Sequence, residues 1–145
     1  MKTGFNQFNV IVRDMDKSLA FYRALGLKID AEPGAFHVNV ELPGILLEFD
    51  TAEFVQKWDT GASGATGGNN VIGFGVASRR GVDDLYARLT EAGYRGRQPP
   101  YDGFWGARYA IVEDPDGNPV GLMSKIKKKH KFWPPAEPPR AGDHQ

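Results

Sequence analysis

The sequence predicts an α+β fold in which two βαβββ modules form one open, cup-shaped mixed sheet with the helices outside. A strand, a helix and further strands occur in the same order twice, over about residues 5–59 and 70–126. Both helix patterns end at a glycine, in Leu25-Gly26-Leu27 and in Ala92-Gly93-Tyr94. One module alone would leave a sheet face bare, whereas two side by side can curl into a cup.

The first module begins with apolar and polar residues that alternate over residues 8–13, which predicts a strand with two different faces. Leu19, Tyr22 and Leu25 then recur at helical spacing, after two aspartates that favour a helix N-terminus. Gly26 predicts the end of this helix. Proline and glycine breaks separate three further predicted strands, at residues 27–30, 36–41 and 45–50.

The second module repeats this order after a linker of small residues at 60–70, which we expect to be mobile or to form a crossover. A strand is predicted at residues 71–76, and a helix with apolar residues at helical spacing ends at Gly93. The remaining predicted strands are residues 94–97, 107–112 and 120–123. We therefore assign residues 1–126 to the domain and residues 127–145 to a basic, proline-rich tail.

The composition limits the classes of protein to which this chain can belong. A chain of 145 residues with 41% hydrophobic residues suits one compact domain or two small fused modules. Residues 1–5 do not resemble a signal peptide, and no stretch approaches the roughly 20 apolar residues that span a bilayer. We expect a cytoplasmic protein without a membrane partner. The absence of cysteine excludes disulfides, thiol nucleophiles and cysteine zinc sites.

A net charge of zero conceals an asymmetry. Residues 125–145 hold six basic and two acidic side chains, whereas residues 1–124 hold 12 basic and 16 acidic ones. The acidic body favours a cationic or neutral ligand over an anionic one. The lysine run is short and lacks interleaved aromatic residues, so we expect a solvated tail and no nucleic-acid partner.

The most informative stretch is residues 104–118, an aromatic strand that leads into a tight turn. Asp114-Pro115-Asp116-Gly117 has turn-forming residues in the order that links two antiparallel strands. Phe104 and Trp105 stand just before the flexible Gly106, where large rings suit a pocket wall. The alternative is that both rings belong to the core.

Three segments, residues 12–22, 24–27 and 113–118, resemble the vicinal oxygen chelate superfamily, which includes glyoxalase I, extradiol dioxygenases and bleomycin-resistance proteins. The resemblance covers about residues 5–125. It implies that a metal-dependent member would carry its ligands at the positions of Gln7, Glu48, Val71 and Gly121. Val71 and Gly121 have no side chain that can bind a metal, and a catalytic zinc ion generally needs three protein ligands. We therefore expect no metal and no cofactor, with Gln7 and Glu48 as residual donors.

His37 is the one histidine of the body, and it alternates with Phe36, Val38 and Val40. If these apolar residues face the cup, His37 points away from it. Glu48 lies between apolar neighbours, so it could serve as a general base or as an orienting hydrogen-bond acceptor.

The bleomycin-resistance branch is most similar, because its members carry a Trp-Gly-x-Arg motif like residues 105–108 before the turn. In that branch the tryptophan and a phenylalanine early in the third strand line a groove for a flat aromatic drug, and two copies pair as a homodimer. The resemblance assigns these roles to Trp105 and Phe36. The candidate ligand contacts are Trp105, Phe36, Phe104, Tyr109, Gln7, Asn9, Glu48 and Gly121.

Glycines at 73, 75 and 121 would leave the cup side of two strands bare and give room for a large ligand. The alternatives are a bulge or large opposing side chains that fill the gap.

The sequence leaves three hypotheses for the function. The leading hypothesis is a metal-free protein that sequesters a small aromatic or hydrophobic molecule, with an antibiotic among the candidates. The second is a lyase, isomerase or dioxygenase of the same superfamily that uses Glu48 as base or ligand. The third is a protein-interaction module that uses the basic tail.

Overall fold

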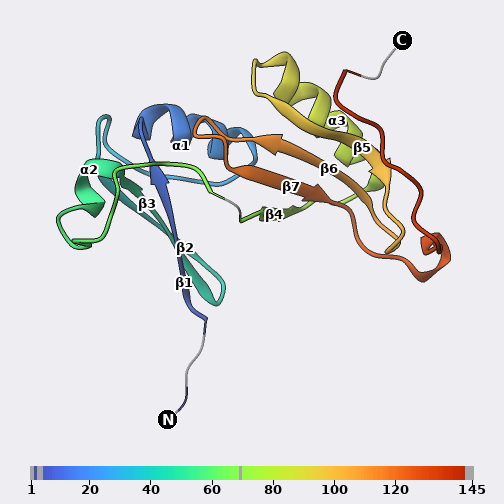
Figure 1. Ribbon diagram of the computed structural model, residues 1–145, viewed down its shortest axis with the longest axis horizontal. Coiled ribbons are helices and arrows are strands. Elements are labelled where there is room, and N and C mark those ends of the chain that lie inside the picture. Colours follow the sequence, from blue (N-terminus) through green and yellow to red (C-terminus); the bar gives the residue numbers. More distant parts are fainter. Residues whose placement is uncertain (1, 3–4, 69, 143–145) are drawn as a thin grey trace. The chain divides into compact units, whose positions relative to one another are not determined.

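The protein is an α+β chain with two open sheets, each in its own compact unit (Figure 1). The computed structural model describes Lys2, residues 5–68 and residues 70–142. The units are Met1–Gly67 and Gly68–Gln145. Met1 and residues 3–4 of the predicted domain, Asn69 of the linker and residues 143–145 of the tail lie outside the described residues.

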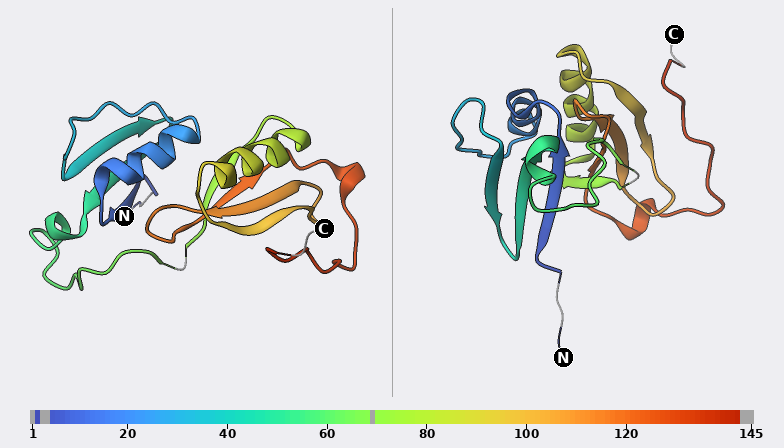
Figure 2. Two further views of the ribbon diagram at one scale, coloured as in Figure 1. Left: turned by 90° about the horizontal axis from the view of Figure 1, so that it is seen from above. Right: turned by 60° about the vertical axis from the view of Figure 1, so that its left-hand side comes forward.

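The first unit has a three-stranded sheet in the order β1-β3-β2. Its strands β1 and β3 are parallel, whereas β2 and β3 are antiparallel. Helix α1 packs on one face of this sheet (Figure 2). Asp14 caps its N-terminus by accepting a hydrogen bond from the backbone N–H of Lys17. The elements are β1 (Gln7–Val12), α1 (Met15–Ala24), β2 (His37–Leu42), β3 (Ile45–Thr51) and the short α2 (Ala52–Val55).

The strand predicted at residues 27–30 is wrong, because this segment has no strand structure. The guanidinium of Arg23 donates two hydrogen bonds to the backbone carbonyl of Ile29, at 3.0 and 2.8 Å. That carbonyl is therefore taken by a side chain instead of a neighbouring strand. The short apolar pattern instead anchors Ile29 in the core, where it is buried.

The second unit has the complete βαβββ order, and its four-stranded sheet has the order β4-β7-β6-β5. Strand β4 is parallel to β7, as β1 is to β3, and the other pairs are antiparallel. The elements are β4 (Ile72–Gly75), α3 (Arg79–Glu91), β5 (Gly96–Asp102), β6 (Arg108–Glu113), β7 (Pro119–Met123) and the 3₁₀ turn η1 (Lys128–His130).

Strand β5 is longer than the predicted residues 94–97 and continues through Pro99 and Pro100. It lies at the edge of the sheet, and its register against β6 shifts twice between Gly96 and Tyr101. An edge strand with irregular pairing tolerates residues without a backbone N–H. The two prolines therefore interrupt the register without ending the strand.

Matching helix ends support the internal repeat. Gly26 and Gly93 follow α1 and α3 with φ of +104° and +100°. The next backbone N–H reaches five residues back in both cases, from Leu27 to Tyr22 and from Tyr94 to Leu89. This is the glycine-terminated helix end that the two sequence triplets predict.

The predicted turn at residues 114–117 is confirmed and links β6 to β7. The carboxylate of Asp114, of which 4% is exposed, accepts hydrogen bonds from the backbone N–H groups of Asp116 and Asn118, both at 2.9 Å. The side-chain amide of Asn118 donates to its second oxygen at 2.8 Å. One buried carboxylate thus satisfies three donors of the turn.

Replacing Asp114 with alanine should lower the free energy of unfolding by about 2–3 kcal/mol, because three donors lose a charged acceptor. Urea unfolding followed by circular dichroism measures this loss. Asp84→Ala, which removes an exposed ion pair with Arg80, should cost less than about 1 kcal/mol. Equal midpoints for the two variants would show that the turn does not depend on Asp114.

The chain after β7 runs back along residues 104–106. The backbone N–H of Lys127 donates to the Gly106 carbonyl at 2.9 Å, and that of Phe132 donates to the Phe104 carbonyl at 3.0 Å. Trp105 and Lys131 form an antiparallel bridge between these contacts. The first part of the basic tail is therefore hydrogen-bonded to the aromatic stretch that precedes β6.

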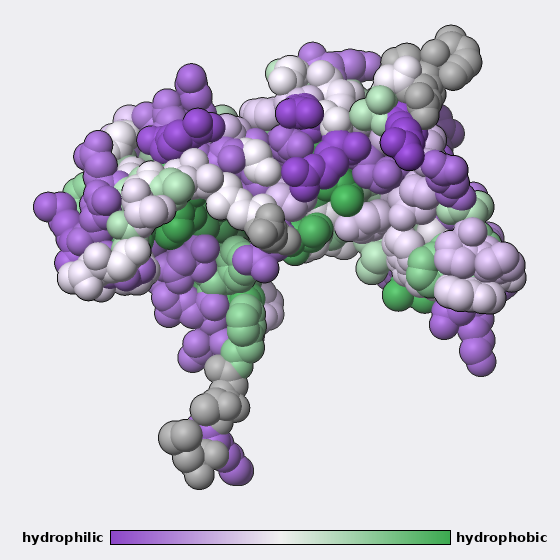
Figure 3. Space-filling view, viewed as in Figure 1, coloured by the Kyte–Doolittle hydropathy of each residue, from purple (hydrophilic) through white to green (hydrophobic). Residues whose placement is uncertain are grey.

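Large apolar side chains also reach the surface of both units. Within the described residues, no helix combines the length and the apolar character needed to cross a bilayer. Figure 3 shows hydrophobic surface in separate patches between hydrophilic side chains. The exposed large apolar residues are Phe5, Phe36, Trp58, Val71, Phe104, Ile126, Phe132 and Trp133.

Candidate functional site

The strand register assigns the two faces of the first sheet. Val38 and Val40 of β2 are buried opposite Phe49 and Leu47 of β3. The Phe49 ring lies 5.0 Å from the Tyr22 ring of α1. Because side chains opposite each other on paired strands share a face, these valines pack on the helix side.

His37 therefore lies on the face opposite α1, which corrects the expectation that it points away from the cup. It pairs with Asp50, one step along the same face from Glu48, which pairs with Asn9 of β1. The sequence argument assumed that Val38 and Val40 face the cup. The structure shows that they form the helix-facing core instead.

A chain of hydrogen bonds joins the polar side chains of this face. The Gln7 side-chain amide donates to Oδ1 of Asn9 at 2.9 Å, and the Asn9 amide donates to Oδ2 of Asp50 at 2.8 Å. Nδ1 of His37 lies 2.5 Å from Oδ1 of Asp50. His37 and Glu48 meet at 3.9 Å, between Nε2 and Oε1. Three candidate residues, Gln7, Asn9 and Glu48, thus share a face with a histidine.

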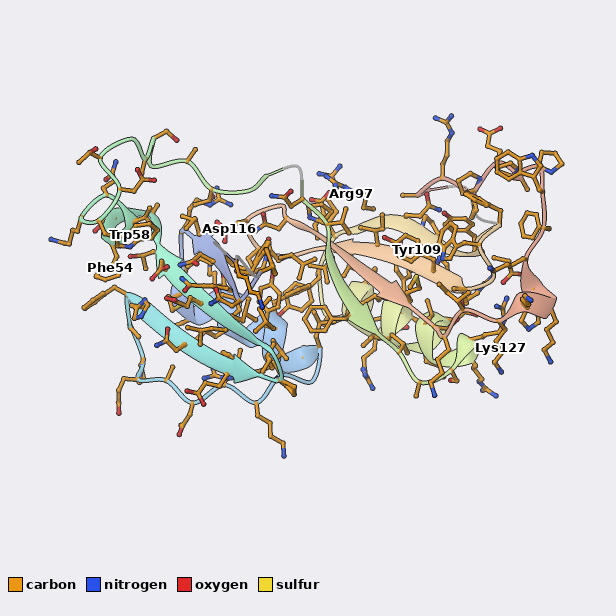
Figure 4. All side chains as sticks on the ribbon, turned by 90° about the horizontal axis from the view of Figure 1, so that it is seen from below. Phe54, Trp58, Arg97, Tyr109, Asp116 and Lys127 are labelled. Carbon is orange, nitrogen blue, oxygen red and sulfur yellow. The ribbon has the colours of Figure 1, made fainter. Side chains whose placement is uncertain are left out.

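Phe36 lies just before β2 and not within it. Its ring is 4.9 Å from the ring of Phe54 in α2, which Figure 4 labels. Phe36 is 59% exposed. Phe36 is thus an accessible aromatic surface at the α2 end of the first unit. Its contact with a ligand remains a prediction.

The second unit gathers Trp105, Phe104 and Tyr109 into one aromatic cluster with Tyr101. The Trp105 ring lies 5.3 Å from Phe104, 5.3 Å from Tyr109 and 6.1 Å from Tyr101, with interplanar angles of 76° to 88°. These are edge-to-face contacts, in which ring edges meet ring faces. The indole Nε1–H also points at the sulfur of Met123, 3.3 Å away.

Pairing of β4, β6 and β7 places this cluster beside bare backbone. Tyr109 pairs with Met123, which pairs with Gly75, so the three share one sheet face, from which Tyr109 projects in Figure 4. A Cβ added at Gly73 or Gly75 would meet no atom within 4 Å. These two glycines leave the open surface that the sequence predicts.

Gly121 does not leave the open surface expected of it. A Cβ there would lie 2.7 Å from the Tyr109 hydroxyl oxygen. The opposing tyrosine fills the gap, as one of the alternatives from sequence proposed. Gly121 therefore lets the Tyr109 ring lie close to β7, and Gly73 and Gly75 provide the free space.

An open hollow of ≈ 740 Å³ adjoins this face. Its volume falls within the range of about 300–1,000 Å³ that is usual for small-molecule sites. Gly75 and Met123 belong both to the hollow and to the face that carries Tyr109. The hollow is lined by Gly75, Val76, Ala77, Met123, Ser124, Lys125 and Ile126.

The two tyrosines of the cluster are neutral, and the nearby Arg108 is already paired. Burial raises the pKa of Tyr109, and burial followed by the Tyr109 charge raises the pKa of Tyr101. Both hydroxyls stay protonated at neutral pH. Arg108, from the Trp-Gly-x-Arg motif, donates to Asp83 of α3 at 2.9 Å and to Asp102 at 3.3 Å. Its role is to fix β6 against α3 and β5.

The four positions implied for a metal divide between the units. Gln7 and Glu48 lie in the first unit, whereas Val71 and Gly121 lie in the second and offer no metal-binding side chain.

Three residues near the candidate sites were not found from the sequence. They are Asp50, which pairs with His37, and Tyr101 and Met123, which contact Trp105. Strand alternation alone contained a signal for Asp50, because it lies two residues from Glu48 on one strand.

Comparisons with known proteins agree with this architecture. The chain resembles hypothetical protein SA1046 from S. aureus, with 26% identity, a TM-score of 0.70, and coverage of 86% of this chain and 95% of that one. It also resembles a glyoxalase-related enzyme from Fulvimarina pelagi (20% identity, TM-score 0.73, covering 86% and 89%). A third structure, lactoylglutathione lyase from Agrobacterium tumefaciens, shows the same fold (17%, 0.64, covering 86% and 96%).

Curated proteins provide no match. The family model of the Glyoxalase/Bleomycin resistance protein/Dioxygenase superfamily matches residues 4–122, which is most of the chain. The repeated βαβ order, the turn after β6 and this match agree. The chain belongs to the Glyoxalase/Bleomycin resistance protein/Dioxygenase superfamily.

Proposed function

We propose that this protein binds and sequesters a flat aromatic or hydrophobic small molecule, as bleomycin-resistance proteins do, and that the aromatic face of the second unit is its main contact surface. One observation carries the proposal: the Tyr109 ring stands on the same sheet face as Gly73 and Gly75, where an added Cβ would meet nothing within 4 Å, and the Trp105 ring packs against Tyr109 at 5.3 Å. Rigid rings beside open backbone offer a flat molecule both a wall and room.

The energetics of this surface suffice for useful affinity. Burying one large apolar group contributes roughly 1.5–3 kcal/mol, and offset stacking adds about 0.5–1.5 kcal/mol. A cationic ligand could gain of order 1 kcal/mol more from the indole face. Several such contacts approach the −8 kcal/mol or so of a micromolar complex. The aromatic surface itself needs no metal.

Replacing Trp105 with alanine should weaken binding of Nile red, a flat uncharged dye, at least about tenfold, which corresponds to roughly 1.4 kcal/mol. Dye fluorescence measures the affinity, and a parallel titration with bleomycin tests the antibiotic as ligand. Trp58→Ala is the matched control, because Trp58 is exposed and belongs to the first unit. Equal weakening in both variants, with folding confirmed by circular dichroism, would refute the proposed surface.

A second candidate function is an enzyme of the same superfamily that uses Glu48 as a base. The observation in its favour is the histidine of the first sheet, which Asp50 orients and which lies 3.9 Å from Glu48. Glu48→Gln distinguishes the two functions. It should abolish turnover of a true substrate, whereas a binding protein should keep its Nile red affinity.

A further inference from the structure

The polar face of the first sheet holds a compact donor cluster that the proposed aromatic surface does not use. His37, Glu48 and Asp50 each offer one ligand atom, and these atoms lie within 4.8 Å of one another. The cluster comes from two adjacent antiparallel strands, β2 and β3, so its spacing is set by the backbone ladder. It shares Glu48 with the positions implied by family resemblance but replaces the other three, which are spread over both units, with His37 and Asp50.

The hydrogen bond to Asp50 fixes the chemistry of His37. Only 1% of Asp50 is exposed, and its other oxygen accepts from Asn9 at 2.8 Å. An ionised carboxylate can only accept, so the imidazole hydrogen is on Nδ1, toward Asp50. In the neutral ring, Nε2 then carries the lone pair and faces the Glu48 side. A carboxylate that holds one imidazole nitrogen while the other binds a cation is the usual support of metal-ligating histidines.

Glu48 is the second, independent sign of a cation. Only 9% of the residue, and 11% of its side chain, is exposed. Among the described residues its carboxylate accepts no hydrogen bond, and its one ion-pair partner, His37 at 3.9 Å, is positive only when protonated. Asp50 adds a second carboxylate within 4.8 Å. A buried carboxylate without donors is costly unless a positive charge compensates it.

The separation suits one ion between the two side chains. Zinc lies about 2.0–2.1 Å from an imidazole nitrogen and about 2.0–2.2 Å from a carboxylate oxygen. In a tetrahedral site such bonds place the nitrogen and oxygen about 3.3 Å apart. The two side chains would therefore approach each other by roughly half an ångström from the present 3.9 Å. Two protein ligands leave the remaining coordination positions for water or for an oxygen of a bound molecule.

We propose that His37 Nε2 and Glu48 form a divalent-cation site of the Zn²⁺ or Co²⁺ type within the first unit, and that Asp50 is its positioning residue. The site replaces the expectation of a protein without metal, which was based on the missing donors at Val71 and Gly121. It goes beyond the proposed binding of an aromatic molecule and does not depend on it. A two-ligand site should bind with a Kd of order 10 µM, weaker than four-ligand structural zinc sites.

The test uses Zn²⁺ and Co²⁺ alone, titrated by calorimetry and by Co²⁺ absorption into protein freed of metal. One equivalent should bind, and His37→Gln and Glu48→Gln should each weaken binding at least about tenfold. Asp50→Asn should weaken metal binding less, and its Co²⁺ complex should still show an absorption spectrum. His130→Gln, outside the cluster, and Glu41→Gln, an exposed carboxylate of the same strand β2, are matched controls and should change nothing.

A measurement on the unmutated protein guards against variants that fail to fold. Zn²⁺ should slow the diethyl pyrocarbonate modification of His37 and leave that of His130 unchanged, as read by peptide mass spectrometry. Weakening by Gln7→Ala instead of His37→Gln would assign the ion to the family positions and overturn the proposal. So would the absence of binding below 1 mM (about a hundredfold weaker than expected) or equal modification of His37 with and without Zn²⁺. Nile red binding is recorded in parallel, so failure of the cation site is distinguishable from failure of the aromatic surface.

Discussion

Gly106→Ala should lower the free energy of unfolding by about 3 kcal/mol or more. Gly106 has φ of +99°, which L side chains rarely adopt. An added Cβ would also lie 2.5 Å from the carbonyl oxygen of Lys127, a backbone atom held by the hydrogen bond from Lys127 N–H to Gly106. The turn therefore cannot relax without losing the contact between residues 104–106 and the chain after β7.

Gly93→Ala is a matched control for this prediction. Gly93 has nearly the same φ, +100°, but its added Cβ would meet nothing within 4 Å. It should cost only the backbone strain, about 1–2 kcal/mol. Urea unfolding gives the free energy of unfolding of each variant. The difference between the two values measures the cost of the close contact with the Lys127 carbonyl oxygen. Equal losses would show that this crowding is relieved without cost.

Filling the open space at Gly73 should weaken ligand binding strongly without harming the fold. Gly73→Val adds a side chain where nothing lies within 4 Å, on a strand where valine is favoured over glycine. We expect stability to stay equal or to rise by up to about 1 kcal/mol. We expect Nile red affinity to fall about a hundredfold, because the space next to Tyr109 and Met123 is lost, which corresponds to roughly 2.7 kcal/mol.

Gly68→Val controls for the chemical change, since a Cβ at Gly68 also meets nothing within 4 Å and the residue precedes β4. It should leave the dye affinity unchanged. Thermal unfolding of each variant establishes that both remain folded. If Gly73→Val bound the dye as tightly as the unmutated protein, the ligand surface would lie elsewhere.

The sequence predicted those parts of the fold that local residues determine. Gly26, Gly93 and the turn that begins at Asp114 were found because positive φ and turn positions have a strong residue preference. The segment at residues 27–30 was mistaken for a strand, since its apolar pattern does not reveal that Arg23 occupies the Ile29 carbonyl. Long-range hydrogen bonds of this kind leave no periodic signal.

The candidate site was predictable in part for the same reason. The aromatic residues around Trp105 could be named because they are close in sequence and unusual in composition. The face of His37 depended on which side of β2 meets α1, and alternation defines two faces without saying which one is buried. The register of β2 against β3 decides this, and it places His37 beside Asp50.

Contact between a flat apolar molecule and Trp105 of the second unit can be tested directly in solution. The most direct measurement is a titration of the ¹⁵N-labelled protein with Nile red, following the three indole N–H signals, with Trp105 assigned through Trp105→Phe. The Trp105 signal should move with the titration while the Trp58 signal stays fixed, because the Trp105 N–H lies against Met123 at the edge of the hollow. A shift of Trp58 with an unmoved Trp105 would contradict binding at the aromatic cluster.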